Sequence, residues 1–135
     1  MSLLLCPCEV EADLVSRQRV LIIDEDRRTV DRLQEKFVQS GFEAEIALSG
    51  AVGVAIAAER HMSVAILSAK IGQEESWSIV RQLRQSDPQL PVVLFNAPKV
   101  KGLSKEARRA GVAKFIQIDV DAHLVYVEAT KLMRN

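Results

Sequence analysis

The sequence predicts an α/β fold, a doubly wound parallel sheet of five strands with helices packed on both faces. Short apolar runs alternate with longer segments in which apolar residues recur at helical spacing. Two of the runs, Val20 to Ile23 and Val64 to Leu67, are continuously apolar, which is typical of strands buried on both faces of a parallel sheet. The 135 residues are enough for one domain with a core and too few for two. Strands and helices that alternate in this way are joined by right-handed crossovers.

Residues 19 to 135 are predicted to form this domain, and residues 1 to 18 a loosely ordered extension. The extension has no basic start and too short an apolar run for a secretion signal. No apolar run in the chain approaches the roughly 20 residues that span a bilayer. Cys6 and Cys8 flank Pro7 without the further ligands of a metal site, so we interpret them as reduced thiols. These observations together predict a cytoplasmic protein.

The first half of the domain is predicted to contain three strands and two helices. Val30, Leu33 and Phe37 recur at helical spacing, and Gly41 follows in the way a glycine ends a helix. The second strand alternates and is flanked by glutamates, which favours an edge position in the sheet. The predicted elements are strand Val20 to Ile23, helix Arg27 to Ser40, strand Ala44 to Leu48, helix Ala51 to Arg60 and strand Val64 to Leu67.

The second half is predicted to contain two more strands and three helices. Ile79, Val80 and Leu83 are expected to face inward, Pro88 to break the helix that carries them, and Gly111 to stop the next one. The predicted elements are loop Ser68 to Glu75, helix Ser76 to Gln85, strand Pro91 to Phe95, helix Ser104 to Ala110, strand Phe115 to Ile118 and helix Ala122 to Met133.

Three consecutive acids, Asp24, Glu25 and Asp26, follow the first strand. Open α/β sheets bind ligands at the carboxyl ends of their strands, so these acids suggest a pocket for a hard cation. The 18 basic and 18 acidic residues of the chain balance to a net charge of zero. This balance argues against a protein that binds nucleic acid or a membrane surface through its bulk charge.

From about Arg19 to Met133 the chain resembles the receiver domain of bacterial two-component response regulators, the CheY-like family. The resemblance rests on the order and lengths of the elements and on four local signatures: LIIDED, VAIL, PVVLFNA and EARRAGVAKFI. The first of these contains the acids, and the last spans the end of a helix and the strand after it. The resemblance implies a flavodoxin-like (βα)5 fold with strand order 2-1-3-4-5 and a role in phosphorelay signal transduction.

The resemblance also implies where phosphoryl chemistry would take place. A receiver takes a phosphoryl group from a phosphohistidine onto an aspartate that ends the third strand, with Mg²⁺ held by that aspartate and the acids of the first. A hydroxyl residue ending the fourth strand and a lysine ending the fifth bind the phosphoryl oxygens. Asp24 and Glu25 match the acids, but Ser68 stands at the phosphoacceptor position. Asn96 stands at the hydroxyl position and Ile118 at the lysine position.

Each replacement has a chemical consequence. A serine hydroxyl is a weaker nucleophile than a carboxylate unless a base activates it, and His61 and His123 are predicted to lie far from Ser68. Ser68 also removes a charge that would hold Mg²⁺, and Ile118 removes the cation that would pair with a phosphoryl group. The sequence therefore predicts a pseudo-receiver that is not an enzyme and has no cofactor. Weak Mg²⁺ binding at Asp24 and Glu25 is the most that this pocket would retain.

Lys70 lies two positions beyond Ser68, close to the acids. Without a metal the three carboxylates would repel one another and raise at least one pKa. We hypothesise that the ammonium group of Lys70 occupies the vacated cation site and fixes the pocket in one state. The alternative is a solvated loop lysine.

The resemblance implies that the surface formed by helix Ser104 to Ala110, strand Phe115 to Ile118 and helix Ala122 to Met133 contacts other proteins. Phe115 stands at the position of an aromatic residue that changes rotamer on phosphorylation, and we expect one fixed rotamer here. Mixed charge on this surface suits a homodimer or a protein partner, and not nucleic acid. The candidate interface residues are Lys105, Arg108, Arg109, Tyr126, Glu128 and Lys131.

Two alternatives remain open at this point. One is an atypical response regulator that is still switched by Mg²⁺ or by phosphoryl binding through unusual residues. The other is a small flavodoxin-like protein that binds a cofactor. The loop DEDRRT argues against the second, because its acids would repel the phosphate of a flavin.

Overall fold

The computed structural model describes residues 18–117 and 121–133. The predicted extension of residues 1 to 18, with Cys6 and Cys8, lies outside the described residues except for Gln18. Ile118 and Asp119 also lie outside them, so the structure does not test the prediction that Ile118 stands at the lysine position.

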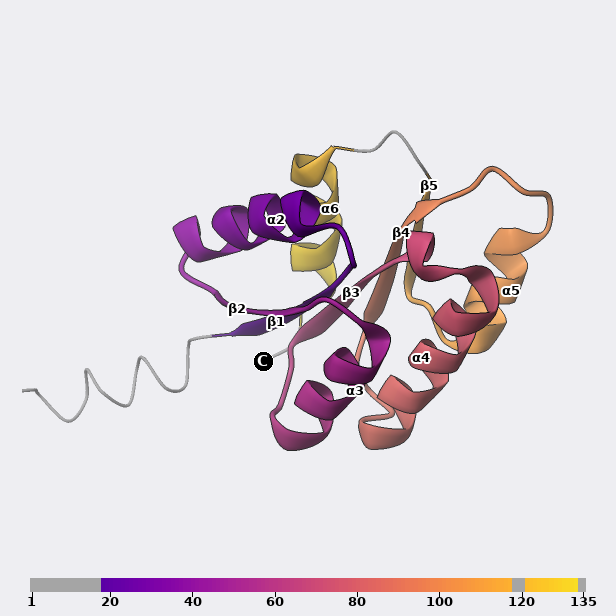
Figure 1. The fold of residues 1–135 in the computed structure, drawn as a ribbon, viewed down its shortest axis with the longest axis horizontal. Coiled ribbons are helices and arrows are strands. Elements are labelled where there is room, and N and C mark those ends of the chain that lie inside the picture. The colour runs from indigo at the N-terminus through magenta and orange to yellow at the C-terminus, as the bar shows by residue number, and fades with distance from the viewer. Residues whose placement is uncertain (1–17, 118–120, 134–135) are drawn as a thin grey trace, which may run out of the picture.

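The described strands form one parallel sheet in the order β2-β1-β3-β4-β5, which confirms the predicted fold class and strand order (Figure 1). Ile22 of β1 lies beside Ile46 of β2 and Ile66 of β3. β2 lies at an edge of the sheet, as its alternating pattern predicts. The strands are β1 (Arg19–Ile23), β2 (Glu43–Ala47), β3 (Val64–Ser68), β4 (Val92–Ala97) and β5 (Lys114–Gln117).

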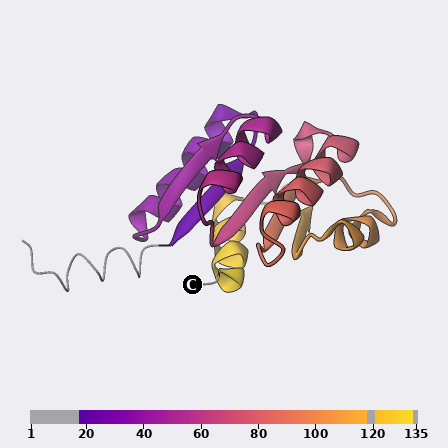
Figure 2. The same ribbon diagram turned by 90° about the horizontal axis from the view of Figure 1, so that it is seen from below.

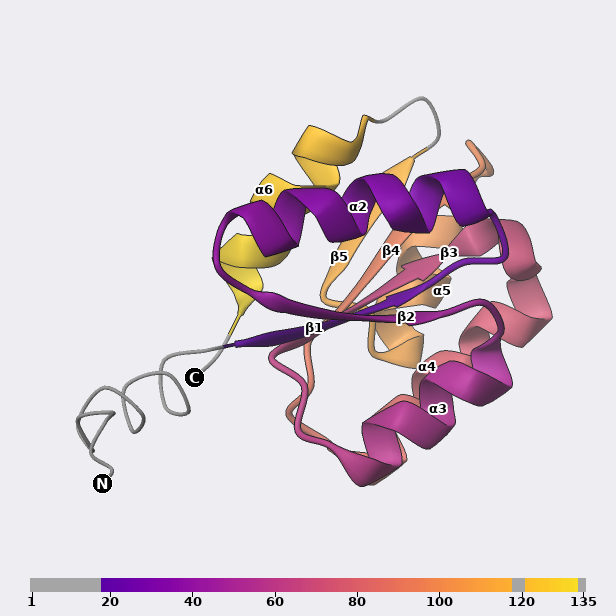
Figure 3. The same cartoon turned by 60° about the vertical axis from the view of Figure 1, so that its left-hand side comes forward.

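Helices cover both faces of the sheet. Figure 3 shows helices above and below the strands, so the domain has three layers. The helices above are α2 (Arg27–Gln39) and α6 (Ala122–Leu132). Those below are α3 (Gly50–Glu59), α4 (Gln73–Ser86) and α5 (Leu103–Ala110), and a short 3-10 turn, η1 (Ala69–Ile71), precedes α4. No helix of the described residues is both long and apolar enough to cross a membrane.

Strand β1, which lies between β2 and β3, contributes to the core on both faces of the sheet. Leu21 and Ile23 belong to the cluster beneath α3, α4 and α5, whereas Val20 and Ile22 belong to the cluster beneath α2 and α6. All four side chains are fully buried. Each such side chain is worth about 1.5–3 kcal/mol when removed from water. The continuous apolar run is therefore explained by a strand with no solvent-facing side.

Two glycines let α3 pack closely against its neighbours. A Cβ atom added at Gly50 would lie 2.2 Å from Cδ1 of Ile79 on α4, and one added at Gly53 would lie 2.5 Å from Cδ1 of Ile23 on β1. Figure 2 shows α3 beside α4 on this face. Any larger residue at either position would therefore push α3 away from the core.

The segment after β3 differs from its prediction. Ser68 to Glu75 was expected to be a loop and the helix to begin at Ser76, but η1 follows Ser68 directly and α4 begins at Gln73. Gly72, with φ of 128°, separates the two, and the Ser76 hydroxyl donates to the Gly72 carbonyl at 2.6 Å. Glu74 and Glu75 lie in the first turn of α4, where acids are favoured, so the sequence did contain a signal for the earlier start.

Candidate functional site

Asp24 is buried at the carboxyl end of β1. Its side chain is 1% exposed, and its Oδ1 atom accepts a hydrogen bond from the backbone N–H of Asp26 at 3.1 Å. Its Oδ2 atom has no hydrogen-bond partner among the described residues. Burial raises the pKa of Asp24, while the Asp26 N–H and the positive charge of Lys70 act in the opposite direction. Asp24 is therefore a desolvated carboxyl group in which Oδ1 accepts a hydrogen bond and Oδ2 accepts none from the described residues.

Asp26 has a structural role as the cap of α2. Its side chain accepts a hydrogen bond from the backbone N–H of Arg28 at 3.0 Å, which satisfies a free donor at the start of the helix. The ammonium nitrogen of Lys70 lies 3.8 Å from its Oδ2 atom. Desolvation acts to raise the pKa of Asp26, but hydrogen bonds from the Thr29 side chain and from backbone N–H groups outweigh it and lower the pKa.

Glu25 lies apart from the other two acids. It lines a shallow depression together with Ser49 and Gly50 of the α3 start and Glu75 of α4, on the other side of the sheet from α2. The three consecutive acids therefore do not converge on one point. In the described ranges, no group of three or more His, Cys, Asp or Glu side chains is arranged to hold a metal ion. The residues present do not fit the Mg²⁺ site that the fold implies.

Ser68 ends β3 and is fully buried. Its Oγ atom accepts a hydrogen bond from the backbone N–H of Lys70 at 3.2 Å and so caps η1. The hydroxyl also contributes to lowering the pKa of Asp24, which places it beside that carboxyl group. His123 stacks against Tyr126 on α6, with ring centroids 6.2 Å apart, and His61 precedes β3 at the opposite end of the sheet. The ionisable group that lies beside the Ser68 hydroxyl is therefore Asp24.

Asn96 adopts a backbone conformation that few residues favour. Its φ is 59°, in the left-handed region that asparagine tolerates better than most residues with a Cβ atom. The register between β4 and β5 shifts between Leu94 and Ala97, so Asn96 lies in an irregular part of the strand. Phe115 of β5 lies beside Leu94 in this register and is half-buried against the cluster beneath α3, α4 and α5.

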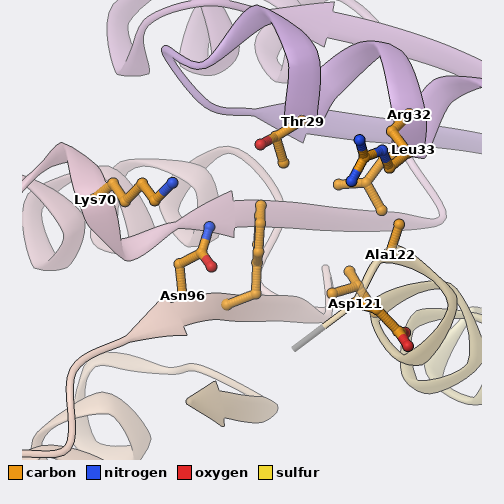
Figure 4. A pocket seen from close by; sticks show the side chains of 9 residues that line it. Thr29, Arg32, Leu33, Lys70, Asn96, Asp121 and Ala122 are labelled. Atoms are coloured by element: carbon orange, nitrogen blue, oxygen red, sulfur yellow. The ribbon is translucent and has the colours of Figure 1, made fainter. Parts of the chain in front are cut away.

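A cavity of about 110 Å³ opens between α2, β4 and the start of α6 (Figure 4). Lys70 and Asn96 point into it from one side, and Thr29 and Arg32 of α2 line it from the other. Asp121 turns its carboxylate toward α6, where it accepts a hydrogen bond from the Leu124 N–H at 2.9 Å. The sequence prediction missed Thr29 and Arg32, although both lie within two turns of Asp26 on the same helix.

The predicted interface residues fall into two groups. Lys105, Arg108 and Arg109 are exposed on α5. Glu128 of α6 lies between Lys114 of β5, at 3.6 Å, and Lys131, at 3.5 Å. Tyr126 instead packs toward α2, with its ring centroid 5.0 Å from that of Phe37 and its hydroxyl donating to Ser40 Oγ at 2.8 Å. We therefore leave Tyr126 out of the surface formed by α5, β5 and α6.

The five-stranded parallel sheet with helices on both faces is the fold of a response regulator receiver domain. The response regulator receiver domain family matches residues 20–126, and the chain belongs to that family, which serves two-component signalling. Members of this family are the receiver domains of response regulators in two-component systems.

Relatives with curated descriptions and solved structures agree with this assignment. The transcriptional regulatory protein PcoR of Escherichia coli is 31% identical over 91 residues, which cover 64% of this chain and 40% of PcoR. The photosynthetic apparatus regulatory protein RegA of Rhodobacter capsulatus is 24% identical over 112 residues, which cover 83% of this chain and 61% of RegA. The chain thus spans less than two thirds of these relatives.

Among solved structures, a CheY-like receiver domain protein from Methanospirillum hungatei superposes with a TM-score of 0.77 at 19% identity. The match covers 85% of this chain and 92% of that one. At this identity the likeness supports the fold alone.

Proposed function

We propose that this domain is a pseudo-receiver, which signals through protein contacts without aspartyl phosphorylation and catalyses no reaction. The observation that carries the proposal is Ser68. It ends β3, where the family places its phosphoacceptor, it is fully buried, and its hydroxyl is engaged in capping η1. The ionisable group beside this hydroxyl is the carboxyl group of Asp24, and a serine hydroxyl is a weaker nucleophile than the carboxylate that it would replace.

We further propose that Lys70 replaces the missing metal. Its ammonium group pairs with Asp26, and its charge lowers the pKa of Asp24. Lys70 thus places a positive charge beside the acids. In the family pattern the position of Ser68 would add a negative charge there. The side chains of the pair are 55% and 41% exposed, so the pair biases the pocket without locking it rigidly. In this proposal the pocket carries its positive charge without Mg²⁺, and nothing remains for phosphorylation to switch.

The surface formed by α5, β5 and α6 is proposed to carry the signal to a partner protein or to a second copy. Phe115 is half-buried against the core in β5. Since Asn96 lacks the hydroxyl that would follow a phosphoryl group, we expect Phe115 to keep a single rotamer. The surface is then presented in the same form at all times.

Trp77 provides a direct test of this proposal. It is buried in α4, which follows η1 and Ser68. We expect its fluorescence to stay constant when Mg²⁺ is titrated to millimolar concentration, with or without beryllium fluoride as a phosphoryl analogue. Mass spectrometry after incubation with acetyl phosphate should show no added phosphoryl group. A saturable fluorescence change at millimolar Mg²⁺ would instead revive the phosphoryl-dependent switch.

The variant Ser68→Asp is the matched positive control for this titration. It restores the carboxyl group at the end of β3 without altering Trp77. We expect it to respond to Mg²⁺ where the unaltered chain does not, because two carboxylates, Asp24 and the new one, would then share a cation.

A further inference from the structure

Three exposed cations lie on the side of α5 that faces away from the core, and Glu106 and Ser104 lie at the margins of that side. Leu103 and Ala107 are buried, at 3% and 1% exposure, and fix the side of the helix that faces the core. At 100° per residue, Lys105, Arg108 and Arg109 lie on the opposite side, and all three are exposed. They form one stripe rather than a scatter of charges.

The surroundings of the stripe extend this positive charge. Between residues 88 and 117 the sequence contains six lysines and arginines and a single acid, Glu106. Lys99 and Lys101 are exposed in the segment that leads into α5, whereas Lys114 on β5 pairs with Glu128. The chain as a whole has no net charge, so this surface is a local concentration that the rest of the molecule offsets elsewhere.

Helix α2 shows what a compensated stripe looks like in the same molecule. Arg28, Arg32 and Lys36 lie at helical spacing, but Asp31 and Glu35 are interleaved with them. Asp31 also pairs with Arg27 at 3.4 Å. Cations in the last turn of a helix are favoured by the helix dipole, which accounts in part for Arg108 and Arg109. The dipole accounts neither for Lys105 nor for the two lysines before the helix.

We propose that α5 and the preceding residues 99–102 dock an acidic segment of a partner protein. This inference rests on the proposed function, because it names the kind of partner that the surface formed by α5, β5 and α6 would take. Charge complementarity carries it, and Val100 adds an apolar contact, since its side chain is 52% exposed between Lys99 and Lys101. A segment that mixes glutamates or aspartates with an occasional apolar residue fits this surface.

The geometry favours an acidic protein over nucleic acid. The stripe from Lys105 to Arg109 extends only about 6 Å along the helix axis, at about 1.5 Å per residue. A duplex binder spreads roughly 6–10 phosphate contacts over a longer path.

The test is a titration of the isotope-labelled chain with a decaglutamate peptide, followed by backbone amide shifts in NMR. We expect the shifts to concentrate in residues 99–110 and to weaken as salt is raised. Reversal of the stripe in Lys105→Glu, Arg108→Glu and Arg109→Glu should weaken binding at least tenfold. The matched control, Arg27→Glu, Arg28→Glu and Lys36→Glu on α2, makes the same change in net charge and should alter binding less than twofold.

Three outcomes would overturn the inference: equal losses in both triple variants, shifts that map away from α5, or tighter binding to a 20-base-pair DNA duplex than to the peptide. A neutral triple variant with glutamine at 105, 108 and 109 guards against misfolding of the reversed one and should lose binding partly. The titration uses neither Mg²⁺ nor a phosphoryl analogue. A Mg²⁺ response of Trp77 would therefore contradict the proposed function without affecting the peptide result. A failure of peptide binding would likewise contradict the docking inference without affecting the proposed function.

Discussion

In the proposed pseudo-receiver, the two sides of the cleft at the carboxyl edge of the sheet depart to different degrees from the family pattern. At the end of β1, the proposal has Asp24 and Glu25 match that pattern. At the ends of β3 and β4, it has Ser68 and Asn96 replace an aspartate and a hydroxyl residue. The retained side and the replaced side lie next to each other, since β1 pairs with β3 and β3 with β4.

The structure shows what these acids do apart from any phosphoryl chemistry. Asp26 caps α2, and Asp24 accepts a hydrogen bond from the Asp26 N–H, so both shape the turn between β1 and α2. Ser68 has a comparable local role, because it caps η1. Each residue of the cleft therefore supports the backbone around it, and retained acids alone are weak evidence for retained catalysis. Substitutions that restore or remove single groups can measure this difference between the two sides.

Restoring the carboxylate at the end of β3 should have the largest effect. Ser68→Asp would place a second negative charge in a fully buried position beside Asp24. An uncompensated buried charge costs about 3–5 kcal/mol, so we expect a loss of that order in the free energy of unfolding at pH 7 without Mg²⁺. Urea denaturation with and without 10 mM Mg²⁺, about the concentration at which weak carboxylate sites fill, should show partial recovery with the metal.

Ser68→Asn is the control, because it has the same shape without the charge. If it destabilises the domain as much as Ser68→Asp does, steric crowding explains the loss and the two sides differ less than we infer.

Restoring the hydroxyl residue at the end of β4 should have a moderate effect. Asn96→Thr would place a β-branched residue at φ of 59°, where a Cβ atom crowds the following carbonyl. We expect a loss of about 1–2 kcal/mol in the free energy of unfolding. Asn96→Gly should be close to neutral, since glycine adopts this conformation freely. Equal stability of the threonine and glycine variants in urea denaturation would mean that the strand relaxes to accept either.

Neutralising the retained acid should stabilise the domain. Asp24→Asn keeps an oxygen for the Asp26 N–H and removes a desolvated charge whose Oδ2 atom lacks a partner. Burying an unsatisfied group of this kind costs about 1–3 kcal/mol, so we expect a gain near the lower end of that range at pH 7.

The pH dependence of this gain tests its cause. The pKa of Asp24 is raised by folding, so the stability that this group contributes is fully present below its unfolded pKa and is lost as the pH rises through its folded pKa. The unaltered chain and Asp24→Asn should therefore differ least at pH 3.5 and most at pH 7. A difference that is constant with pH would show that the charge of Asp24 is not its cause.

Removing the substitute cation should have the smallest effect on stability. Lys70→Met deletes the ammonium group near Asp26 and its influence on Asp24, so the pKa of Asp24 should rise further. In thermal unfolding we expect a slight fall in Tm at low salt that fades in 1 M NaCl, where exposed charges are screened. The pH at which Asp24→Asn gains its advantage should also move upward in this background. An unchanged pH profile would show that Lys70 is a solvated lysine whose charge does not affect the pKa of Asp24.

The sequence predicts the fold well because its signals are local and repeated. The apolar strands and the helical spacing of Val30, Leu33 and Phe37 suffice for the topology. The geometry of the candidate site is harder to predict from the sequence, because residues that are adjacent in the chain point their side chains in different directions. Three consecutive acids point to three different surroundings, which no periodicity reveals. The approach of Arg32 to the cavity and the pairing of Tyr126 with α2 depend on tertiary packing between α2 and the distant end of the chain.

The contact between Tyr126 and α2 has a consequence for how the domain is made. Its hydroxyl reaches Ser40, 86 positions earlier in the chain, and its ring covers Phe37. During synthesis, the apolar side of α2 therefore emerges long before the helix that shields it. Domains generally complete folding as units, so this layer of the core stays open until almost the whole chain has left the ribosome. A nascent chain arrested before α6 should thus expose Phe37 to chaperones and proteases. The opposite face of the sheet can already be packed at that stage.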